Sequence, residues 1–132
     1  MEPIISFPSR DYDEPVKFVQ LDVTNGSEVR KYLFFGSEPK VSDSYYRKIL
    51  INSLSGLNLE YRWDRLASGT PVPQRCGERY FVRGMGMAIV SRKNHSFKVI
   101  DGVFGDYNLG IDKSHLEKIV DSLGKYWKIE AL

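Results

Sequence analysis

Arginine and aromatic side chains alternate along one short stretch of the chain, Arg79-Tyr80-Phe81-Val82-Arg83. If this stretch is a strand, Arg79, Phe81 and Arg83 project from one face, because successive side chains of a strand point to opposite faces. Guanidinium groups pair with carboxylates and phosphates, and they stack on aromatic rings. The stretch is therefore the strongest candidate for a binding surface, for an acidic protein or, alternatively, for a nucleic acid.

Further cations flank this stretch in the sequence. Between residues 75 and 98 six basic residues stand against one glutamate, whereas residues 1–14 contain four acidic residues and one arginine. The net charge of +2 is too small to indicate a partner, but this distribution favours an acidic one. The acidic N-terminal segment of the chain itself could also neutralise the basic stretch. The candidate binding residues are Arg75, Arg79, Phe81, Arg83, Arg92 and Lys93.

Cys76 is the one residue that suggests covalent chemistry. It lies between Arg75 and Gly77, and nearby guanidinium charge favours the nucleophilic thiolate. A catalytic cysteine also needs a base, for which His95 or His115 are the available histidines. A small enzyme or ligand-binding protein that uses Cys76 is therefore the third alternative. An incidental thiol is the simpler interpretation.

Patterns for metal or cofactor binding are incomplete. The two histidines do not have the spacing of metal ligands, and one cysteine cannot build a standard zinc site. Asp106 and Asn108 resemble the start of a calcium loop, but Gly110 and Ile111 stand where a ligand and a glycine are required. We therefore expect no metal and no cofactor.

Length and composition indicate one folded domain over residues 1–132. The chain is 42% hydrophobic and 13% aromatic, which is typical of a globular protein. No run approaches the roughly 18 apolar residues of a membrane helix, so we expect no membrane partner. The N-terminus lacks the pattern of a secretory signal, and a lone cysteine favours a reducing compartment. We expect a cytoplasmic protein.

The first half of the chain predicts an arm, a hairpin, a helix and a strand. Three prolines predict an extended arm over residues 1–15, which Ile4, Ile5 and Phe7 could dock on the body. Residues 16–24 and 27–35 predict a hairpin whose three-residue turn, 24–26, sets Leu21 opposite Val29. A helix follows over 43–54, capped by Ser42 or Asp43 and stopped by Gly56, and alternation then predicts a strand over 57–63. Apolar residues occur on both hairpin faces, so both faces should be covered.

The second half predicts a long loop, a meander, a helix and a strand. Residues 64–77 have no period and predict a loop, and 78–111 predict three antiparallel strands. Gly84 and Gly86 interrupt the first strand, as at a bulge or a close backbone approach, and Asp101-Gly102 predicts a tight turn before a strand over 106–111. A helix over 113–123 has Asp112 or Ser114 as its cap, and 126–132 predict a strand.

Together these elements predict an α+β domain. Two amphipathic helices pack on a largely antiparallel sheet made of the hairpin, the single strand, the three-stranded meander and the C-terminal strand. Both halves end in hairpin, helix and strand, as an internal duplication would produce. Amphipathic helices resemble one another without common origin, however, so this pattern alone does not establish a repeat.

The expected function is binding without catalysis, because no reactive constellation accompanies the basic strand. We expect a protein-binding module, such as a stoichiometric inhibitor or an antitoxin- or immunity-like partner, that meets an acidic protein surface. This hypothesis requires Arg79 and Arg83 to face outward. Pairing of both guanidinium groups with carboxylates of the same chain would refute it.

Overall fold

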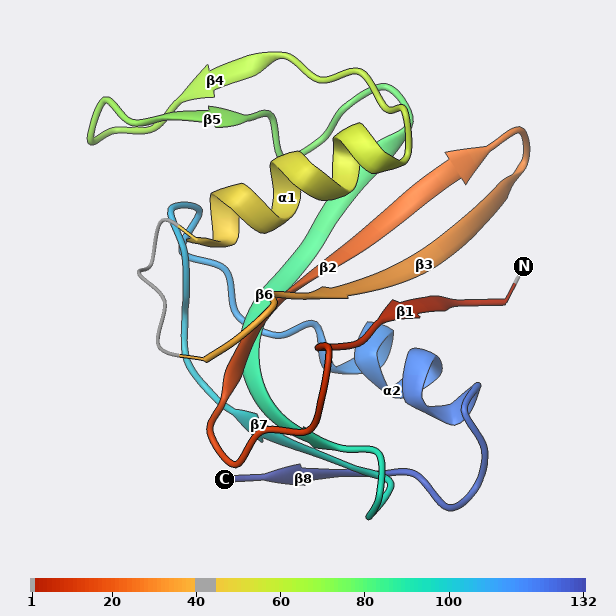
Figure 1. Cartoon of the computed structure of the whole chain (residues 1–132). Helices are drawn as coiled ribbons and strands as arrows, with labels where there is room; N and C mark the ends of the chain where they lie inside the picture. The colour runs from red at the N-terminus through yellow and green to blue at the C-terminus, as the bar shows by residue number, and fades with distance from the viewer. Residues whose placement is uncertain (1, 40–44) are drawn as a thin grey trace.

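A computed structural model describes residues 2–39 and 45–132 of the chain (Figure 1). Six strands form one sheet in the order β1-β3-β2-β6-β7-β8, and a separate pair, β4-β5, lies beyond α1. The strands of the large sheet are β1 (Ile4–Ser6), β2 (Val16–Asn25), β3 (Glu28–Phe35), β6 (Tyr80–Ser91), β7 (Ser96–Ile100) and β8 (Lys128–Ala131). The remaining elements are α1 (Tyr45–Gly56), β4 (Trp63–Arg65), β5 (Pro71–Pro73) and α2 (Lys113–Asp121).

The α+β class is confirmed, but the sheet is mixed. Its four central strands pair antiparallel, whereas β1 joins β3 and β8 joins β7 in parallel. The prediction of a largely antiparallel sheet is therefore wrong at both edges. The first half ends in β4, outside the large sheet, and the second half ends in β8, inside it. The two halves thus differ in how their last strands pair.

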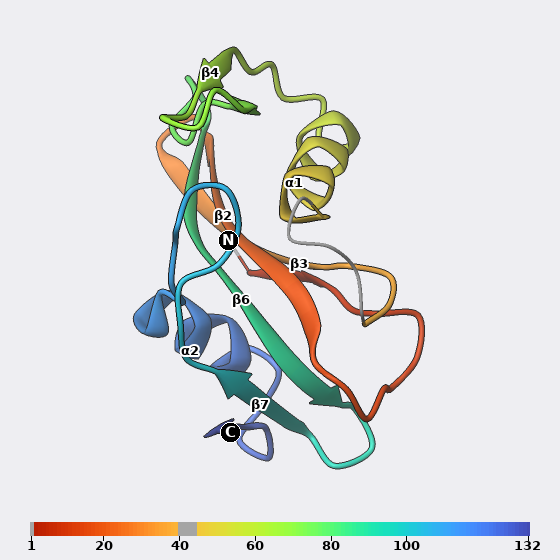
Figure 2. The same ribbon diagram turned by 90° about the vertical axis from the view of Figure 1, so that its left-hand side faces the viewer.

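The two helices cover opposite faces of the sheet (Figure 2). The first core joins α1 to the face of β2 that carries Val19, Leu21 and Val23. The second core joins α2 to the face that carries Phe18 and includes Leu33 of β3. From Val16 to Val23 every residue of β2 is therefore buried. This confirms the prediction that both faces of the hairpin are covered.

The hairpin register differs from the prediction. Asn25 pairs with Glu28 and Leu21 pairs with Tyr32, so the turn consists of Gly26 and Ser27, with Gly26 at a φ of +68°. Leu21 does not oppose Val29, which is 46% exposed. The prediction selected the register that collects apolar residues on one face. That criterion fails for a strand that is buried on both faces.

The interruption predicted at Gly84 is a β-bulge. Gln20 pairs with Gly84 and the next residue of β2, Leu21, pairs with Val82, so Arg83 is the extra residue of β6. A Cβ atom at Gly84 would lie 2.4 Å from Oε1 of Gln20 and 2.7 Å from the carbonyl oxygen of Gly110. The strand therefore both bulges and meets another backbone at this point.

The third strand of the predicted meander does not form. Gly105 and Asn108 adopt positive φ angles of +71° and +52°, and Phe104 and Leu109 form an isolated bridge across the turn between them. The alternation over 106–111 therefore reflects a folded-back loop, whose Phe104, Tyr107 and Leu109 pack on the first core. β8 occupies the place beside β7 instead.

The end of α1 also differs from the prediction. Asn58, with a φ of +54°, takes the left-handed position, and Leu59 N–H donates to the carbonyl of Leu54 at 2.9 Å. This is a Schellman motif in which Asn58 replaces the expected Gly56. The positive φ breaks the strand predicted over 57–63, of which only Trp63 belongs to β4. The predicted caps Ser42 and Asp43 lie outside the described residues.

The predicted loop over 64–77 contains two short strands. β5 pairs antiparallel with β4, and Val72 is fully buried. The hydroxyl groups of Tyr80 and Tyr107 donate to the carbonyls of Gln74 and Pro73, Tyr80 at 2.5 Å. These contacts fix β5 to the main body.

The predicted cap of α2 is confirmed. Asp112 accepts a hydrogen bond from the backbone N–H of His115 at 3.1 Å, and the predicted strand near the C-terminus is β8. Within residues 2–39 and 45–132 neither helix is long and apolar enough to cross a membrane.

Candidate functional site

A stack of one aromatic ring and two guanidinium groups lies at the start of β6. The guanidinium carbons of Arg75 and Arg83 lie 5.0 Å and 4.7 Å from the centre of the Phe81 ring. Arg75 is also held by a 3.0 Å hydrogen bond from its Nε to the carbonyl of Val82. Cation–π contacts and this hydrogen bond order three of the predicted binding residues into one surface. We call Arg75, Phe81 and Arg83 the arginine stack.

The two arginines on which the binding hypothesis depends have different partners. Arg83 Nε donates to Oδ2 of Asp22 at 2.6 Å, so this guanidinium is paired with a carboxylate of the same chain. The side chain is nevertheless 45% exposed, and its terminal amino groups have no hydrogen bond to the described residues. Arg79 is exposed and donates from Nε to the carbonyl of Thr24 at 3.4 Å, with no carboxylate partner among those residues. One of the two arginines is thus neutralised internally.

A chain of buried polar side chains leads to Arg83 from the second core. The side-chain oxygen of Gln20 accepts a hydrogen bond from the backbone N–H of Asp112 at 2.9 Å, and the side-chain nitrogen donates to the backbone carbonyl of Asp112 at 3.0 Å. These two bonds fix the orientation of the Gln20 side-chain amide. The amide nitrogen also lies 3.1 Å from Nδ1 of His115, so Nδ1 must accept. The proton of the neutral ring then resides on Nε2, which donates to Oδ1 of Asp22 at 2.8 Å. Both ring nitrogens of His115 are therefore occupied within the protein.

Asp22 is the charged centre of this network. Burial alone would raise the pKa of its carboxyl group, because desolvation disfavours the charged form. Hydrogen bonds from His115 and Arg83 outweigh burial, and the pKa of Asp22 lies below its ordinary value of 3.8. The carboxylate is therefore ionised at neutral pH and holds Arg83 by a charge-assisted hydrogen bond.

A polar cleft of about 250 Å³ opens beside this network, between β3, β6 and α2. Sequence reasoning missed three of the residues that line it besides Arg83, namely Lys31, Ser114 and Lys118. Lys31 lies far from the other two in the sequence, and the only local signal was a polar residue at each position. The polar residues of β2 gave a stronger signal, because Gln20 and Asp22 interrupt the apolar residues between Phe18 and Val23.

Arg92 and Lys93 lie apart from the arginine stack. They follow the far end of β6, nine residues after Arg83, which corresponds to at most about 30 Å of strand. Asp11 accepts hydrogen bonds from the backbone N–H groups of both, at 3.0 Å for Arg92 and 3.4 Å for Lys93. The guanidinium of Arg92 also donates to the carbonyl of Pro8. The acidic arm of the chain therefore meets this part of the basic stretch.

Cys76 is exposed and has no histidine beside it among the described residues. Its pocket, of about 270 Å³, is lined by Glu60, Tyr61, Arg62, Gln74, Gly77 and Glu78. His95 instead packs against Trp127, with ring centres 5.2 Å apart, and His115 is buried in the network described above. The structure therefore does not assemble the cysteine–histidine pair that a nucleophilic mechanism requires.

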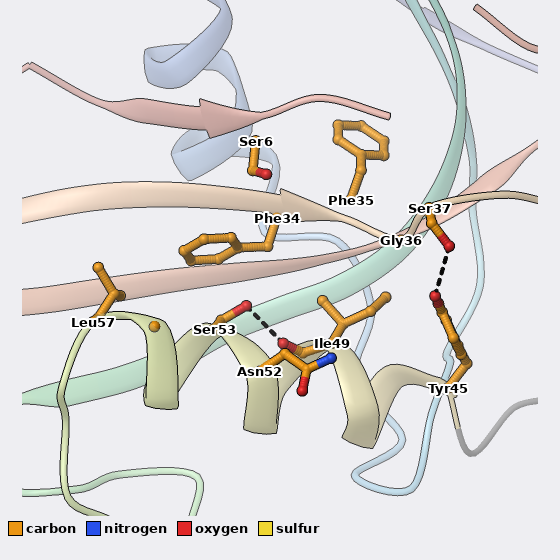
Figure 3. Close-up of a pocket in the computed structure, with 11 residues that line it drawn as sticks. Ser6, Phe34, Phe35, Gly36, Ser37, Tyr45, Ile49, Asn52, Ser53 and Leu57 are labelled. Carbon is orange, nitrogen blue, oxygen red and sulfur yellow. Dashed lines mark hydrogen bonds between the residues drawn. The ribbon is translucent and has the colours of Figure 1, made fainter. Parts of the chain in front are cut away.

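A larger groove of about 460 Å³ lies between α1 and the end of β3 (Figure 3). Phe34, Ile49 and Leu57 supply its apolar lining, and the carboxamide of Asn52 lies on the helix side. Ser37 and Tyr45, whose hydroxyl oxygens are 2.9 Å apart, close one end. The groove has no charged lining residue among those described.

Within the described part of the chain, no group of three or more histidine, cysteine, aspartate or glutamate side chains is placed to hold a metal ion. A comparison with models of known protein families found no match, and a comparison with curated proteins found no similar sequence. The interpretation of the site therefore depends on its geometry.

Proposed function

We propose that the chain is a protein-binding module that recognises an acidic partner through the arginine stack and Arg79. The observation that carries this proposal is the ordered Arg75–Phe81–Arg83 stack on an exposed strand face. Arginine and aromatic residues dominate the energetics of protein interfaces, and ordering them before binding lowers the entropy cost of association.

Aromatic residues also lie beside the segment that precedes β6. Tyr61 lines the same pocket as Cys76, and Cys76 forms a bridge with Phe81. The ring of Tyr61 packs edge-on against Trp63 with centres 5.5 Å apart, and Trp63 is 57% exposed. An exposed tryptophan beside a basic, aromatic surface is typical of an interface that another protein covers.

The charge pattern favours a protein over a nucleic acid. Glu60 and Glu78 line a cleft together with Arg79, so two carboxylates lie beside one cation on this part of the surface. A phosphate backbone presents continuous negative charge and is repelled by such carboxylates. A protein surface with mixed charges can complement both signs.

The form of the function that we expect is a stoichiometric inhibitor or an antitoxin- or immunity-like partner. The absence of an assembled nucleophile–base pair among the described residues supports binding as the activity. If the partner is an enzyme, its activity should fall to a minimum at a one-to-one ratio of the two proteins. A catalytic, substoichiometric effect would contradict this form of the proposal.

The test begins with affinity capture of the partner and continues with isothermal titration of the purified pair. Arg79→Glu and Arg75→Glu should each weaken binding by at least about tenfold, which corresponds to about 1.4 kcal/mol. Lys125→Glu is the matched control, because Lys125 is also exposed but lies after α2. Unchanged affinity of both arginine variants would refute the proposed surface. Capture of nucleic acid, with affinity that falls steeply as salt is added, would assign the surface to that class instead.

A further inference from the structure

The buried polar chain in the second core requires an explanation that packing does not provide. Gln20 is 0% exposed, His115 4% and Asp22 8%. Apolar side chains of similar volume would fill this space without the cost of removing charged and polar groups from water. The chain of hydrogen bonds begins at the backbone of Asp112 and ends at the guanidinium of Arg83, which is exposed. Its distinctive result is therefore the placement of one surface arginine.

Each link restricts the next one. The two bonds between Gln20 and the backbone of Asp112 fix the amide, and the amide fixes the tautomer of His115. The imidazole holds one oxygen of Asp22 at 2.8 Å, and the other oxygen holds Arg83 Nε at 2.6 Å. Arg83 is also the bulge residue of β6, and bulges redirect a side chain from the regular alternation of a strand. The guanidinium is thus oriented, while its terminal amino groups remain available.

The net charge of the side chains that line the cleft beside Arg83 suits the binding of one negatively charged group. Three cations line it, namely Lys31, Arg83 and Lys118, together with the carboxylates of Asp22 and Asp112. These five side chains together carry one net positive charge. Neither lysine has an ion-pair partner among the described residues. The hydroxyl group of Ser114 adds a neutral hydrogen-bond donor.

We infer that this cleft is a carboxylate-binding subsite, which receives one aspartate or glutamate side chain of the acidic partner. The terminal amino groups of Arg83 bind the carboxylate in a fork, and Lys31 and Lys118 add charge on either side. Asp22, His115 and Gln20 are positioning residues that act through Arg83. This inference rests on the proposed function and names the chemical group recognised there.

The subsite can be tested without the partner by titrating the ¹⁵N-labelled protein with short blocked peptides in an NMR experiment. The probes are acetyl-Ala-Glu-Ala-amide and its glutamine counterpart. The glutamate peptide should produce saturable shifts at the Arg83 Nε–H and at the backbone amides of Lys31, Ser114 and Lys118, and the glutamine peptide should not. Equal shifts with both peptides, or no saturable shifts, would overturn the subsite. A phosphoserine peptide that binds more than about tenfold tighter would assign the cleft to dianions and overturn the carboxylate assignment.

Variants separate binding from positioning. The double variant Lys31→Gln/Lys118→Gln removes one half-buried and one exposed cation and should weaken binding of the glutamate peptide about fivefold, the size expected for two ion pairs near the surface. Asp22→Asn makes the cleft more positive, so simple electrostatics would tighten peptide binding. If Asp22 acts by positioning Arg83, Asp22→Asn should instead weaken binding of the glutamate peptide, by at least about threefold. Tighter binding would refute the positioning role, and the double variant still tests the cleft if Asp22→Asn fails to fold.

The inference and the proposed function can fail separately. A partner complex that is weakened by Arg79→Glu but not by Lys31→Gln/Lys118→Gln would leave the binding surface intact and remove the subsite. A complex insensitive to Arg75→Glu and Arg79→Glu would remove the proposed surface. Saturable binding of the glutamate peptide would still support the subsite in that case.

Discussion

Asp22 is the residue whose replacement should be most informative about stability. Its pKa is lower in the folded protein than the ordinary 3.8, so the unfolded chain binds a proton more readily than the folded one. The stabilisation by Asp22 is therefore present above pH 3.8 and is lost as the pH falls below that value. Asp22→Asn should lower the free energy of unfolding at neutral pH by about 1–3 kcal/mol, because it weakens bonds to Arg83 and His115.

Urea denaturation at neutral pH and below pH 3.8 checks this prediction. The protein should lose more stability on acidification than the Asp22→Asn variant does. Asp13→Asn is the control, because Asp13 is an exposed carboxylate of the arm. An equal loss of stability on acidification in the unmodified protein and in Asp22→Asn would show that Asp22 does not contribute to the acid response.

At this scale the sequence placed Phe81 and Arg83 on one face, but it predicted neither the stacking of Arg75 on Phe81 nor the residues that orient Arg83. Regular alternation was the basis of that prediction, whereas Arg83 is the extra residue of a bulge. Arg83 and Asp22 are 61 residues apart, and His115 lies 93 residues from Asp22. Contacts over such separations depend on strand order and on the side of the sheet that a helix covers. Neither property follows from local periodicity.

The end of α1 illustrates how a single backbone angle sets an element boundary. Asn58 occupies the left-handed region, which asparagine tolerates better than alanine does. Asn58→Ala should therefore lower the free energy of unfolding by about 1 kcal/mol. Gly56→Ala is the opposite case, because an added Cβ at Gly56 meets nothing within 4 Å and alanine favours the helix. Thermal denaturation of both variants, with reduced melting temperature for Asn58→Ala alone, would confirm the Schellman motif.

The tyrosines that hold β5 predict a response to alkali. Burial is the main cause that raises the pKa of Tyr80 to about 12, with contributions from Cys76 and Tyr61, and burial also raises the pKa of Tyr107. A raised pKa means that the folded protein retains its proton longer than the unfolded chain does. The stabilisation by the protonated Tyr80 is therefore fully present below pH 10.0, the ordinary pKa of tyrosine, and is lost as the pH rises through about 12.

Tyr80→Phe should remove a late part of the tyrosinate absorbance titration, near pH 12, and reduce alkaline unfolding. Tyr126→Phe is the control, because Tyr126 is 71% exposed. If both variants titrate alike, Tyr80 is not the buried tyrosine that responds to alkali. Loss of the hydroxyl also removes the hydrogen bond to Gln74, so the backbone amides of Val72 and Gln74 should exchange faster in Tyr80→Phe.

Helices and strands with a regular apolar pattern were predictable from the sequence. Segments whose shape depends on one residue at a positive φ angle were not. Both helices follow from the spacing of their apolar residues, and β6 and β7 from their β-branched and aromatic content. The strands predicted over 57–63 and 106–111 alternate in sequence but contain Asn58 and Asn108 at positive φ. A strand was predicted over 126–132, but the parallel pairing of β8 and of β1 was missed, because each pairs with a partner that periodicity does not identify.

The N-terminal arm joins distant parts of the molecule. Its β1 pairs with β3, Phe7 packs near Phe97 and Trp127, and Asp11 binds the turn between β6 and β7. Asp11→Ala should therefore increase hydrogen exchange at Arg92, Lys93 and β1 while the β2–β6 amides keep their protection. Asp13→Ala is the control. Unchanged exchange in β1 would show that the arm is held by Phe7 and strand pairing alone.

The seam between β2 and β6 has a consequence for the rate of folding. It joins Val16 to Ala88, 72 positions apart, whereas both hairpins of the sheet are local. Closing so long a segment costs entropy before any native contact across the seam compensates, so this step should limit the rate and place folding in the millisecond-to-second range. Gly84 lies on this seam, and a methyl group at its position would strike the carbonyl oxygen of Gly110. A larger residue at position 84 should therefore hinder the pairing of β2 with β6.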